Sequence, residues 1–501
     1  MTDRTTLPDT QPDELDALLA AADAAAVLWA ECGIADRAEA LRTIAYALDT
    51  AESELVKLAQ GESHLPEPRL RSELARTTFQ LRHFAEVVEE GSWLEAVIDT
   101  ADPNARPPRP DLRRLLVPLG PVVVFAASNF PFAFSVAGGD TVAALAAGCP
   151  VVVKSHPGHP RLALRTGEIV QAAVRDAGAP DGVFELIFGL DAGREVLTDP
   201  RVKAGSFTGS YPAGSALFHL AASRPKPIPF YAEMSSLNPV FVTSAAATAR
   251  GADIARGYVG SFTLGTGQFC TKPGLLFLPA GHGIGEFLGE ALREVPAAPM
   301  LGDWISEGYQ RVLAGLKSIP GVQTVVDGKS TSSGGVTPTL LRTTVPDLIA
   351  HADVLLEECF GPTSIIVEYA TIDELYAAAD VFGGNLAATV HAEVHDTDLV
   401  EPLLTRLRER VGRLIWNGWP TGVAVAWAMH HGGPYPATTS PLFTSVGATG
   451  MRRFLRPVCY QDMPQGLLPE ALRDSNVLGI PRRVNGVLTE ADVTAQRQGD
   501  S

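Results

Sequence analysis

The most constraining feature of the sequence is a series of short apolar runs that alternates with helix-like segments from about residue 120. The runs lie at 122–126, 151–153, 183–188, 203–207 and 228–231. Helices are expected between them, near 138–148, 161–177, 192–198 and 212–223. Short buried strands separated by helices favour parallel pairing with helices on both faces of the sheet. The pattern predicts a doubly wound α/β domain whose ligand binds beyond the carboxyl ends of the strands.

The rest of the chain supplies further helices, an arm and a second α/β segment. Helices are expected over 13–60 and about 70–90, and the proline-rich stretch 101–111 favours an extended arm or hairpin. The second α/β segment runs from 237 to 430, and the tail from about 440 is expected to be partly loose. In that segment, helices are expected at 250–264 and 371–381, and strands at 275–279, 364–369 and 386–391.

The net charge limits the kinds of partner that are expected, and the number of cysteines indicates the expected compartment. The chain has 501 residues and a formal net charge of -17, which disfavours nucleic acid and anionic membranes as partners. Five cysteines cannot all pair, so a reducing cytoplasm is the expected compartment. The N-terminus lacks the pattern of a signal peptide. The uncharged stretch 115–139 is broken by prolines, which favours buried strands and loops over a membrane span.

Cys270 is the strongest candidate for a nucleophile. It lies in LGTGQFCTKPG, where the glycines and the following proline predict a loop. Small residues before a thiol let backbone N–H groups approach a reacting atom, although an intracellular cysteine is more often a small buried hydrophobe. That second interpretation is preferred for the other four cysteines, which are Cys32, Cys149, Cys359 and Cys459.

Two polar residues follow predicted strands at the edge where α/β sites form. Glu233 ends an apolar strand in PIPFYAEMSSLNP, where a buried carboxylate could activate water or could simply be a loop charge or helix cap. Asn129 in SNFP could donate to an oxyanion or satisfy a turn. Neither residue identifies a reaction by itself.

The remaining motifs are weaker. In SFTGSYPAG, Gly209 and Gly214 follow a strand and open a helix, a geometry that suits a phosphate group. No Lys-Ser/Thr pair follows Gly214, which excludes a P-loop. The histidine pairs in KSHPGHP and at 430–431 lack a suitably spaced acidic or cysteine partner, so no metal site is expected.

Taken in order, six motifs resemble those of the aldehyde dehydrogenase superfamily over nearly the whole chain. They are LGPVVVFAASNFPF, VVVKSHPGHP, GSFTGS, AEMSSLNP, GTGQFC and EECFGP. Within the superfamily the chain is most similar to the α-ketoglutaric semialdehyde (2,5-dioxovalerate) dehydrogenases, through SNFPFAFSVAGGDTVAALAAGCPVVVKSHPGHP, HHGGPYPATT and RRFLRPVCYQ. The resemblance implies a Rossmann-type cofactor domain over 1–236 with an oligomerisation arm at 93–116. It also implies an α/β catalytic domain over 237–430 and a C-terminal segment, 431–501, that returns to the cofactor domain and oligomer interface.

The same resemblance assigns roles to individual residues. It implies that Cys270 is the nucleophile, Glu233 the general base and Asn129 the oxyanion donor. Lys154 would bind the adenosine ribose, Ser210 the pyrophosphate and Glu358 the nicotinamide ribose. Neighbouring or charged residues that would also contact the cofactor are His156, Arg194, Gly209 and Phe360.

Two departures from the family pattern bear on specificity. Many NAD-preferring members have a glutamate where this chain has Pro157, and such a carboxylate would repel a 2′-phosphate. NADP is therefore predicted to be used at least as well as NAD, and the candidates for a matching positive charge are Lys154, His156 and Arg194. At 235–237 this chain has Ser-Ser-Leu where many relatives have two glycines and a lysine, which we interpret as a packing variation.

The substrate stays open at this stage. An oxo-acid semialdehyde requires a cation in the pocket. Arg113, Arg114, Arg452, Arg453 and Arg456 are candidates, but surface positions are more common for each of them. A long-chain or broad-specificity aldehyde would instead suit an apolar tunnel lined by Phe130, Phe132 and Trp427. A catalytically silent binding protein and a coenzyme A-dependent acylating enzyme are further alternatives, and a homodimer or homotetramer is expected from the arm.

Overall fold

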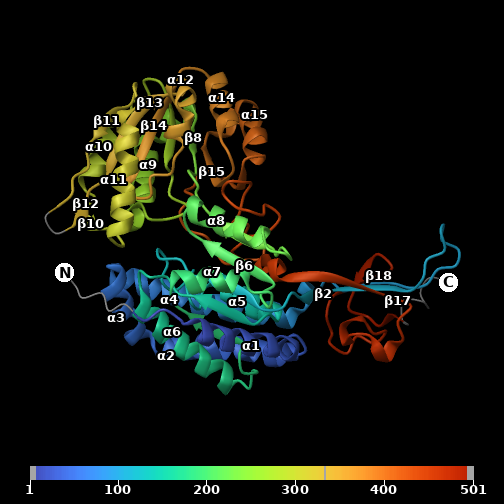
Figure 1. Ribbon diagram of the computed structural model, residues 1–501. Coiled ribbons are helices and arrows are strands. Elements are labelled where there is room, and N and C mark those ends of the chain that lie inside the picture. The colour runs from blue at the N-terminus through green and yellow to red at the C-terminus, as the bar shows by residue number, and fades with distance from the viewer. Residues whose placement is uncertain (1–6, 332–333, 494–501) are drawn as a thin grey trace.

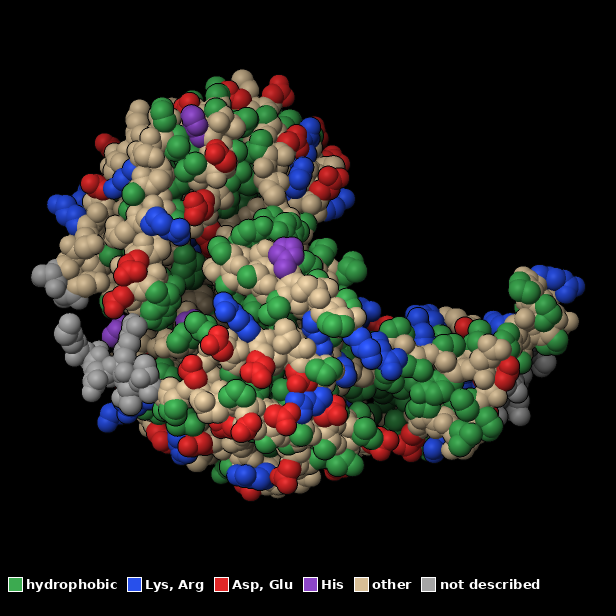
Figure 2. Space-filling view, in the orientation of Figure 1, with side chains coloured by type: hydrophobic (Ala, Val, Ile, Leu, Met, Phe, Trp, Pro, Cys, Tyr) green, Lys and Arg blue, Asp and Glu red, His purple; other side chains and the backbone are tan. Residues whose placement is uncertain are grey.

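A computed structural model describes residues 7–331 and 334–493 of the chain. It contains two α/β lobes, one above the other in Figure 1, and an extended sheet that projects to one side of the lower lobe. The same projection is visible in the space-filling view of Figure 2. The α/β class expected from the sequence is confirmed.

The lower lobe is built on a five-stranded sheet in the order β5-β4-β3-β6-β7, with all neighbours parallel. Its strands are β3 Val122–Phe125, β4 Val151–Lys154, β5 Phe184–Ile187, β6 Ala204–Thr208 and β7 Phe230–Glu233. The helices that connect them are α5 Gly139–Ala147, α6 Pro160–Asp176, α7 Leu190–Thr198 and α8 Tyr211–Ala222. The strand order reverses between β3 and β6, which is where doubly wound sheets bind their ligands.

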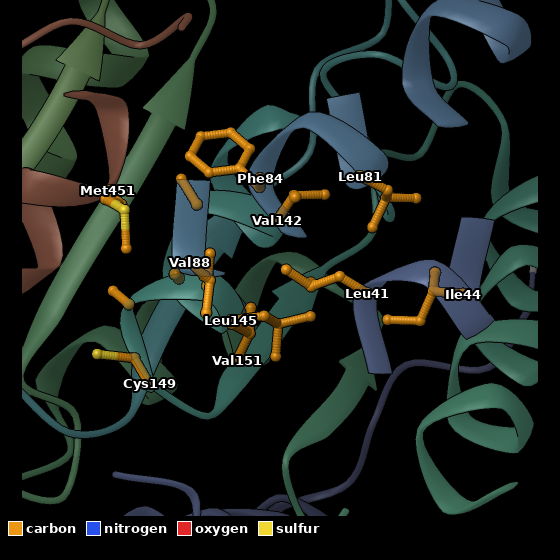
Figure 3. Close-up of a cluster of buried hydrophobic side chains, with 14 of the residues drawn as sticks. Leu41, Ile44, Leu81, Phe84, Val88, Val142, Leu145, Cys149, Val151 and Met451 are labelled. Atoms are coloured by element: carbon orange, nitrogen blue, oxygen red, sulfur yellow. The ribbon is translucent and has the colours of Figure 1, made fainter. Parts of the chain in front are cut away.

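Four N-terminal helices pack against this sheet and its connecting helices. They are α1 Pro12–Ala30, α2 Ile34–Thr50, α3 Glu52–Ser63 and α4 Glu67–Glu90. Figure 3 shows part of the shared core, in which side chains of α2, α4 and α5 surround Val151 of β4. Cys149 lies in this core with no exposed surface, as expected for a small buried hydrophobe.

The upper lobe holds a seven-stranded sheet in the order β11-β13-β14-β9-β8-β15-β16, parallel except for β11. Its strands are β8 Val240–Val242, β9 Leu275–Pro279, β11 Gln323–Val326, β13 Thr339–Thr344, β14 Thr363–Tyr369, β15 Asn385–His391 and β16 Val411–Trp416. Its helices are α9 Ser244–Thr263, α10 Gly285–Arg293, α11 Asp303–Ser318, α12 Val345–Ala350, α13 Ala352–Leu355, α14 Ile372–Val381 and α15 Thr397–Arg408.

The projecting sheet joins the proline-rich segment to the C-terminal tail. Its order is β17-β2-β1-β18-β19, in which β1 Val97–Asp99 and β2 Leu112–Pro118 form a hairpin around residues 101–111. β17 Leu455–Gln461 pairs along the whole of β2. β18 Arg482–Val484 pairs with β1, and β19 Val487–Thr489 pairs with β18.

The expectation of a partly loose tail is wrong as far as residue 493. Strand pairing satisfies its backbone, and apolar side chains such as Phe454, Leu472 and Ile480 are buried. Residues 494–501 lie outside the described part of the chain. Among the described helices, none combines the length and apolar character needed to span a lipid bilayer.

Candidate active site

Four distant segments of the chain meet at the carboxyl edge of the lower sheet. Glu233 is the last residue of β7, and Asn129 lies four residues after the end of β3. Cys270 follows α9 and the short 3-10 helix Leu264–Gly267. His431 lies between β16 and β17, more than 150 residues after Cys270 in the chain. Because these segments converge, the two residues expected to act as nucleophile and base lie together.

Glu233, His431 and Cys270 form one cluster, in which Cys270 is half-buried. His431 Nε2 lies 3.1 Å from Glu233 Oε1 and 3.6 Å from Cys270 Sγ. The hydroxyl of Ser445 donates to the other oxygen of Glu233 at 2.8 Å, and Cys270 Sγ lies within 4.8 Å of this carboxylate. Both Glu233 and His431 are almost fully buried. The carboxylate therefore sits where side-chain donors rather than bulk water stabilise its charge.

The protonation states of the cluster follow from these contacts. Burial by itself would raise the pKa of Glu233, but His431, Ser445 and Cys270 more than offset it, so this pKa lies below its usual value. Burial raises the pKa of the Cys270 thiol well above its usual value, and the Glu233 carboxylate raises it further. At neutral pH the resting pair is thus a thiol beside a carboxylate that can accept its proton.

The Cys270 loop is held by two asparagines. The Asn129 amide donates to Gln268 O at 3.1 Å, which places the predicted oxyanion donor beside the nucleophile loop. The Asn238 amide donates to Cys270 O at 2.8 Å. Gly267 has φ +66, and a Cβ there would come within 2.2 Å of Gly361 O. These contacts fix the backbone that carries the thiol, so its sulfur has a defined position.

A cavity of about 910 Å³ opens onto this cluster. Eight residues of its lining either have a predicted catalytic or cofactor-binding role or are adjacent to such a residue. They are Ser128, Asn129, His156, Gly209, Ser210, Cys270, Glu358 and Phe360. Lys154 is buried at the end of β4 and does not line the cavity. Arg194 lies on α7 with its side chain 74% exposed, 3.9 Å from Asp191, and does not line the cavity either.

The shape and chemistry of this cavity fit a dinucleotide. Gly209 and Ser210 lie at its wall where α8 begins, and the first-turn N–H groups of a helix attract phosphate. A Cβ at Gly209 would meet the Phe207 ring at 2.5 Å, so a side chain there would disturb the phosphate end. Glu358, which accepts from Ser235 Oγ at 2.8 Å, lies on the same cavity. Burial raises the pKa of Glu358 to about 7.

His156 does not supply the positive charge expected from the sequence. Burial lowers its pKa well below the usual value, and His159 and Lys154 lower it further. Its Nδ1 accepts from the N–H of Gly158 at 2.9 Å, which suits a neutral ring. Burial also lowers the pKa of Lys154. Of the residues predicted from the sequence to supply positive charge, only Lys154 therefore remains near this part of the cavity.

His431 and Ser445 are the functional-site residues that the sequence reasoning missed. The pair 430–431 was interpreted as lacking a partner, because Glu233 lies almost 200 residues away in the chain. The available signal was the position of His431 within HHGGPYPATT, one of the stretches that carries the closer resemblance. With Glu233 and Cys270, His431 also presents three potential metal-ligand atoms within 4.8 Å of one another, so the expected absence of a metal stays a prediction.

Comparisons with known proteins identify the family of the chain. The chain is 46% identical to "Alpha-ketoglutaric semialdehyde dehydrogenase 2" of Azospirillum brasilense, over 90% of this chain and 87% of the relative. It is 42% identical to "Alpha-ketoglutaric semialdehyde dehydrogenase" of Acinetobacter baylyi, over 95% and 92% respectively. A solved "E. coli NADP dependent enzyme" superposes with a TM-score of 0.77 at 25% identity, over 91% of this chain and 92% of that one. The sequence model of the "Aldehyde dehydrogenase family" matches residues 2–435, and the chain belongs to this family.

Proposed function

We propose that this enzyme oxidises α-ketoglutaric semialdehyde to its carboxylate and uses NADP at least as well as NAD. The observation that carries the proposal is the cluster of Cys270, Glu233 and His431 at one end of a cavity whose other wall includes the start of α8. The two relatives above 40% identity, both named α-ketoglutaric semialdehyde dehydrogenases, support the choice of substrate.

The residues of the cluster suit the chemistry of covalent aldehyde oxidation. Cys270 attacks the aldehyde carbon while Glu233 accepts the thiol proton. The oxyanion of the resulting thiohemiacetal lies near the Asn129 amide, and a single well-placed donor of this kind stabilises a transition state by about 3 kcal/mol. A bound nicotinamide cofactor would supply the hydride acceptor for this carbon. Glu233 passes the thiol proton to solvent, and its carboxylate then deprotonates the water that hydrolyses the Cys270 thioester, while His431 and Ser445 keep the carboxylate in place.

The preference for NADP rests on Pro157. This residue is exposed just after β4, three positions beyond Lys154, and it offers no carboxylate to the adenosine ribose. A 2′-phosphate therefore meets no fixed negative charge at this position, and Lys154 is the nearest predicted cation. The places of Ser210, Gly209, Glu358 and Phe360 on the cavity wall support the cofactor-binding roles that the resemblance implies for them. Arg194 would contribute only if its exposed side chain reached the ligand.

The arm suits a homodimer or homotetramer. Apolar side chains are strongly exposed on the projecting sheet and its flanking loops (Figure 2), including Leu467, Val477, Val487 and Leu488. Exposed apolar groups gathered on one region favour burial against another copy. We also propose a cytoplasmic location, since a free Cys270 thiol needs a reducing compartment.

The proposal is tested by NADPH and NADH formation with purified protein. The panel contains α-ketoglutaric semialdehyde, succinic semialdehyde and long-chain aldehydes, with Cys270→Ala as the inactive control. The expected result is the highest kcat/KM with α-ketoglutaric semialdehyde and NADP. Preference for a long-chain aldehyde would favour the alternative specificity, whereas no turnover on any aldehyde would favour a binding protein. Turnover that requires coenzyme A and is insensitive to Glu233→Gln would indicate an acylating enzyme.

A further inference from the structure

Helix α4 carries a stripe of polar side chains along its inward face. Its members recur every three or four positions, the spacing that places side chains on one face of a helix. They are Arg69, Glu73, Arg76, Gln80 and His83. Glu73 accepts from the N–H groups of Phe132 and Ala133, at 2.8 and 3.0 Å, and Arg69 Nη2 donates to Asn129 O at 2.6 Å. Buried polar groups usually have such partners, so a member that lacks them is informative.

Arg76 is such a member. Its Nη1 is buried and has no hydrogen-bond partner among the described residues, as is also true of one atom each of Arg69, Glu73 and His83 in the same stripe. Its Nη2 donates to Val423 O at 3.3 Å. Arg69, about two turns earlier, has the carboxylate of Glu73 within 3.9 Å, but no carboxylate in the described part of the chain lies within ion-pair distance of Arg76. A guanidinium with a free buried N–H group can still accept an anion.

A second guanidinium reaches the same loop from the upper lobe. Arg413 lies on β16, and its Nη1 donates to Gly422 O at 3.2 Å while its Nη2 donates to Pro420 O. Arg413 likewise has no ion-pair partner among the residues that the structure describes. Residues 420–423 thus accept from two arginines that come from different lobes. Backbone carbonyls position these two charges but do not neutralise them.

A series of side-chain contacts through Phe134 and His431 links Arg76 to the nucleophile. Its Cζ lies 5.4 Å from the centroid of Phe134, and this ring lies 6.5 Å from the ring of His431. His431 in turn contacts Cys270. Burial lowers the pKa of Arg76, while the negative charges of Glu73 and of the Cys270 thiolate form oppose this effect. Arg76 is therefore within electrostatic range of the reacting sulfur.

Two glycines let the strand that carries Arg413 pack closely against the segment that carries His431. A Cβ on Gly412 would come within 2.0 Å of Gly432 O, so the start of β16 lies directly against the segment that carries His431. Burial lowers the pKa of Arg413, and the charge of the Cys270 thiolate form again opposes this. Neither Arg413 nor Arg76 lines the 910 Å³ cavity. The two guanidiniums therefore lie outside the lining of the proposed cofactor cavity.

The arginines suggested by the sequence are engaged elsewhere. Arg453 pairs with Asp140 at 2.7 Å, and Arg452 pairs with Glu95 at 2.7 Å. Arg113 pairs with Asp111 and Asp474, both at 2.8 Å. The remaining two, Arg114 and Arg456, are exposed on the strands of the projecting sheet. None of these five therefore offers an unpaired guanidinium beside the nucleophile.

We infer that Arg76 and Arg413 bind the carboxylate of an oxo-acid aldehyde whose carbonyl is held at Cys270. This inference rests on the proposed function, because it assigns the anionic end of the proposed substrate. Two guanidiniums without carboxylate partners provide charge-assisted hydrogen bonds that a neutral aldehyde cannot use. They also supply the locally basic region that a chain with net charge -17 requires to bind an anion.

The test compares a charged and a neutral substrate in the full-length enzyme. kcat/KM is measured with α-ketoglutaric semialdehyde and with pentanal for wild type, Arg76→Gln, Arg76→Lys and Arg413→Gln. Removing one partner of a buried charge pair is expected to lower the charged-to-neutral ratio by roughly 30-fold or more. Arg76→Lys should retain part of this preference. The matched control is Arg82→Gln on the same helix, where Arg82 is exposed and pairs with Asp49, and its ratio should equal that of wild type.

A ratio that stays at the wild-type value in both glutamine variants would overturn the inference. Wild-type protein supplies a second measurement that does not depend on folding of the variants. Glutarate should inhibit competitively with the aldehyde, at least tenfold more strongly than neutral glutaramide, and equal inhibition by the two would overturn the inference. Oxidation of pentanal without preference for the oxo acid would refute the inference but leave aldehyde oxidation intact. No turnover on either aldehyde would refute the proposed function itself.

Discussion

Replacing His431 by alanine removes one of the side-chain donors that stabilise the Glu233 carboxylate. The bond from His431 Nε2 to Glu233 Oε1 is 3.1 Å long and both groups are almost fully buried. A hydrogen bond to a charged group contributes about 1.5–3 kcal/mol, and about 1.4 kcal/mol corresponds to one pKa unit. The pKa of Glu233 should therefore rise by roughly one to two units in the variant. Burial, which opposes the charged form, is then less well compensated.

The sign of the kinetic effect follows from the role of Glu233. The base must be unprotonated, and activity is lost as the pH falls through its pKa. A higher pKa therefore moves the acid limb of the kcat profile to higher pH by roughly one to two units. Above the shifted limb, kcat should return to within a few-fold of wild type, because the carboxylate and the nucleophile are still present.

The assay is NADPH formation between pH 5 and 9, with the first-turnover burst recorded separately from the steady state. The burst reports attack by Cys270 and loss of hydride, whereas the steady state also includes hydrolysis that depends on Glu233. His431→Gln, which keeps an N–H donor, should show a smaller shift than His431→Ala. Because Glu358 has a pKa of about 7, the profile is repeated in a Glu358→Gln background to isolate the Glu233 limb.

His430→Ala is the matched control, since this neighbouring histidine makes no hydrogen bond to Glu233 in the described structure. Its acid limb should coincide with that of wild type. If the acid limb of folded His431→Ala also coincided with wild type, the inferred coupling between His431 and the base would be wrong. Thermal unfolding of each variant establishes that the proteins compared are folded.

Other predictions concern the cofactor, the oxyanion, the core and metal inhibition. Pro157→Glu should lower kcat/KM with NADP at least tenfold and leave NAD largely unaffected, and equal losses with both would refute the assignment of this position. Asn129→Ala should lower kcat by roughly 100- to 1000-fold without a matching loss of cofactor affinity, which is measured by fluorescence titration. Cys149→Ala should lower the free energy of unfolding by about 1 kcal/mol and leave kcat unchanged, since the side chain lies in the core of Figure 3. Zn²⁺ should inhibit reversibly by bridging Cys270 Sγ and His431 Nε2, whose 3.6 Å separation suits tetrahedral zinc, and His431→Ala should be less sensitive in the same activity assay.

The elements of the fold were predictable from local patterns. The runs predicted at 122–126, 151–153 and 228–231 are short and apolar, and they overlap the parallel strands β3, β4 and β7, although β7 extends two residues further than its run. Helix α6 begins at Pro160 and ends just before Gly178, as this proline and this glycine predict. The interval 13–60 is helical but divides into three helices. The division of the chain into domains at 236 and 430 stays a prediction.

Site residues were predictable only where the sequence immediately around them is distinctive. Cys270 and Glu233 stand in distinctive stretches, so the resemblance could assign them, and the structure places them together. His431 and Ser445 act on a residue about 200 positions away, and no local pattern encodes such a contact. The polar stripe of α4 was visible in the sequence as charges at heptad spacing, but its inward orientation depends on the helices packed around it.

The route of the C-terminal segment has a consequence for the timing of synthesis. His431 and Ser445 are followed closely by the 3-10 helix Ala448–Phe454 and then by β17, which pairs along β2 of the arm. A ribosome completes the segment with Glu233 and Cys270 well before the one with these donors. The nascent chain thus holds a nucleophile and a base whose donors are still missing. These donors reach Glu233 only after the chain has been synthesised as far as Ser445, shortly before the strand that pairs with the arm.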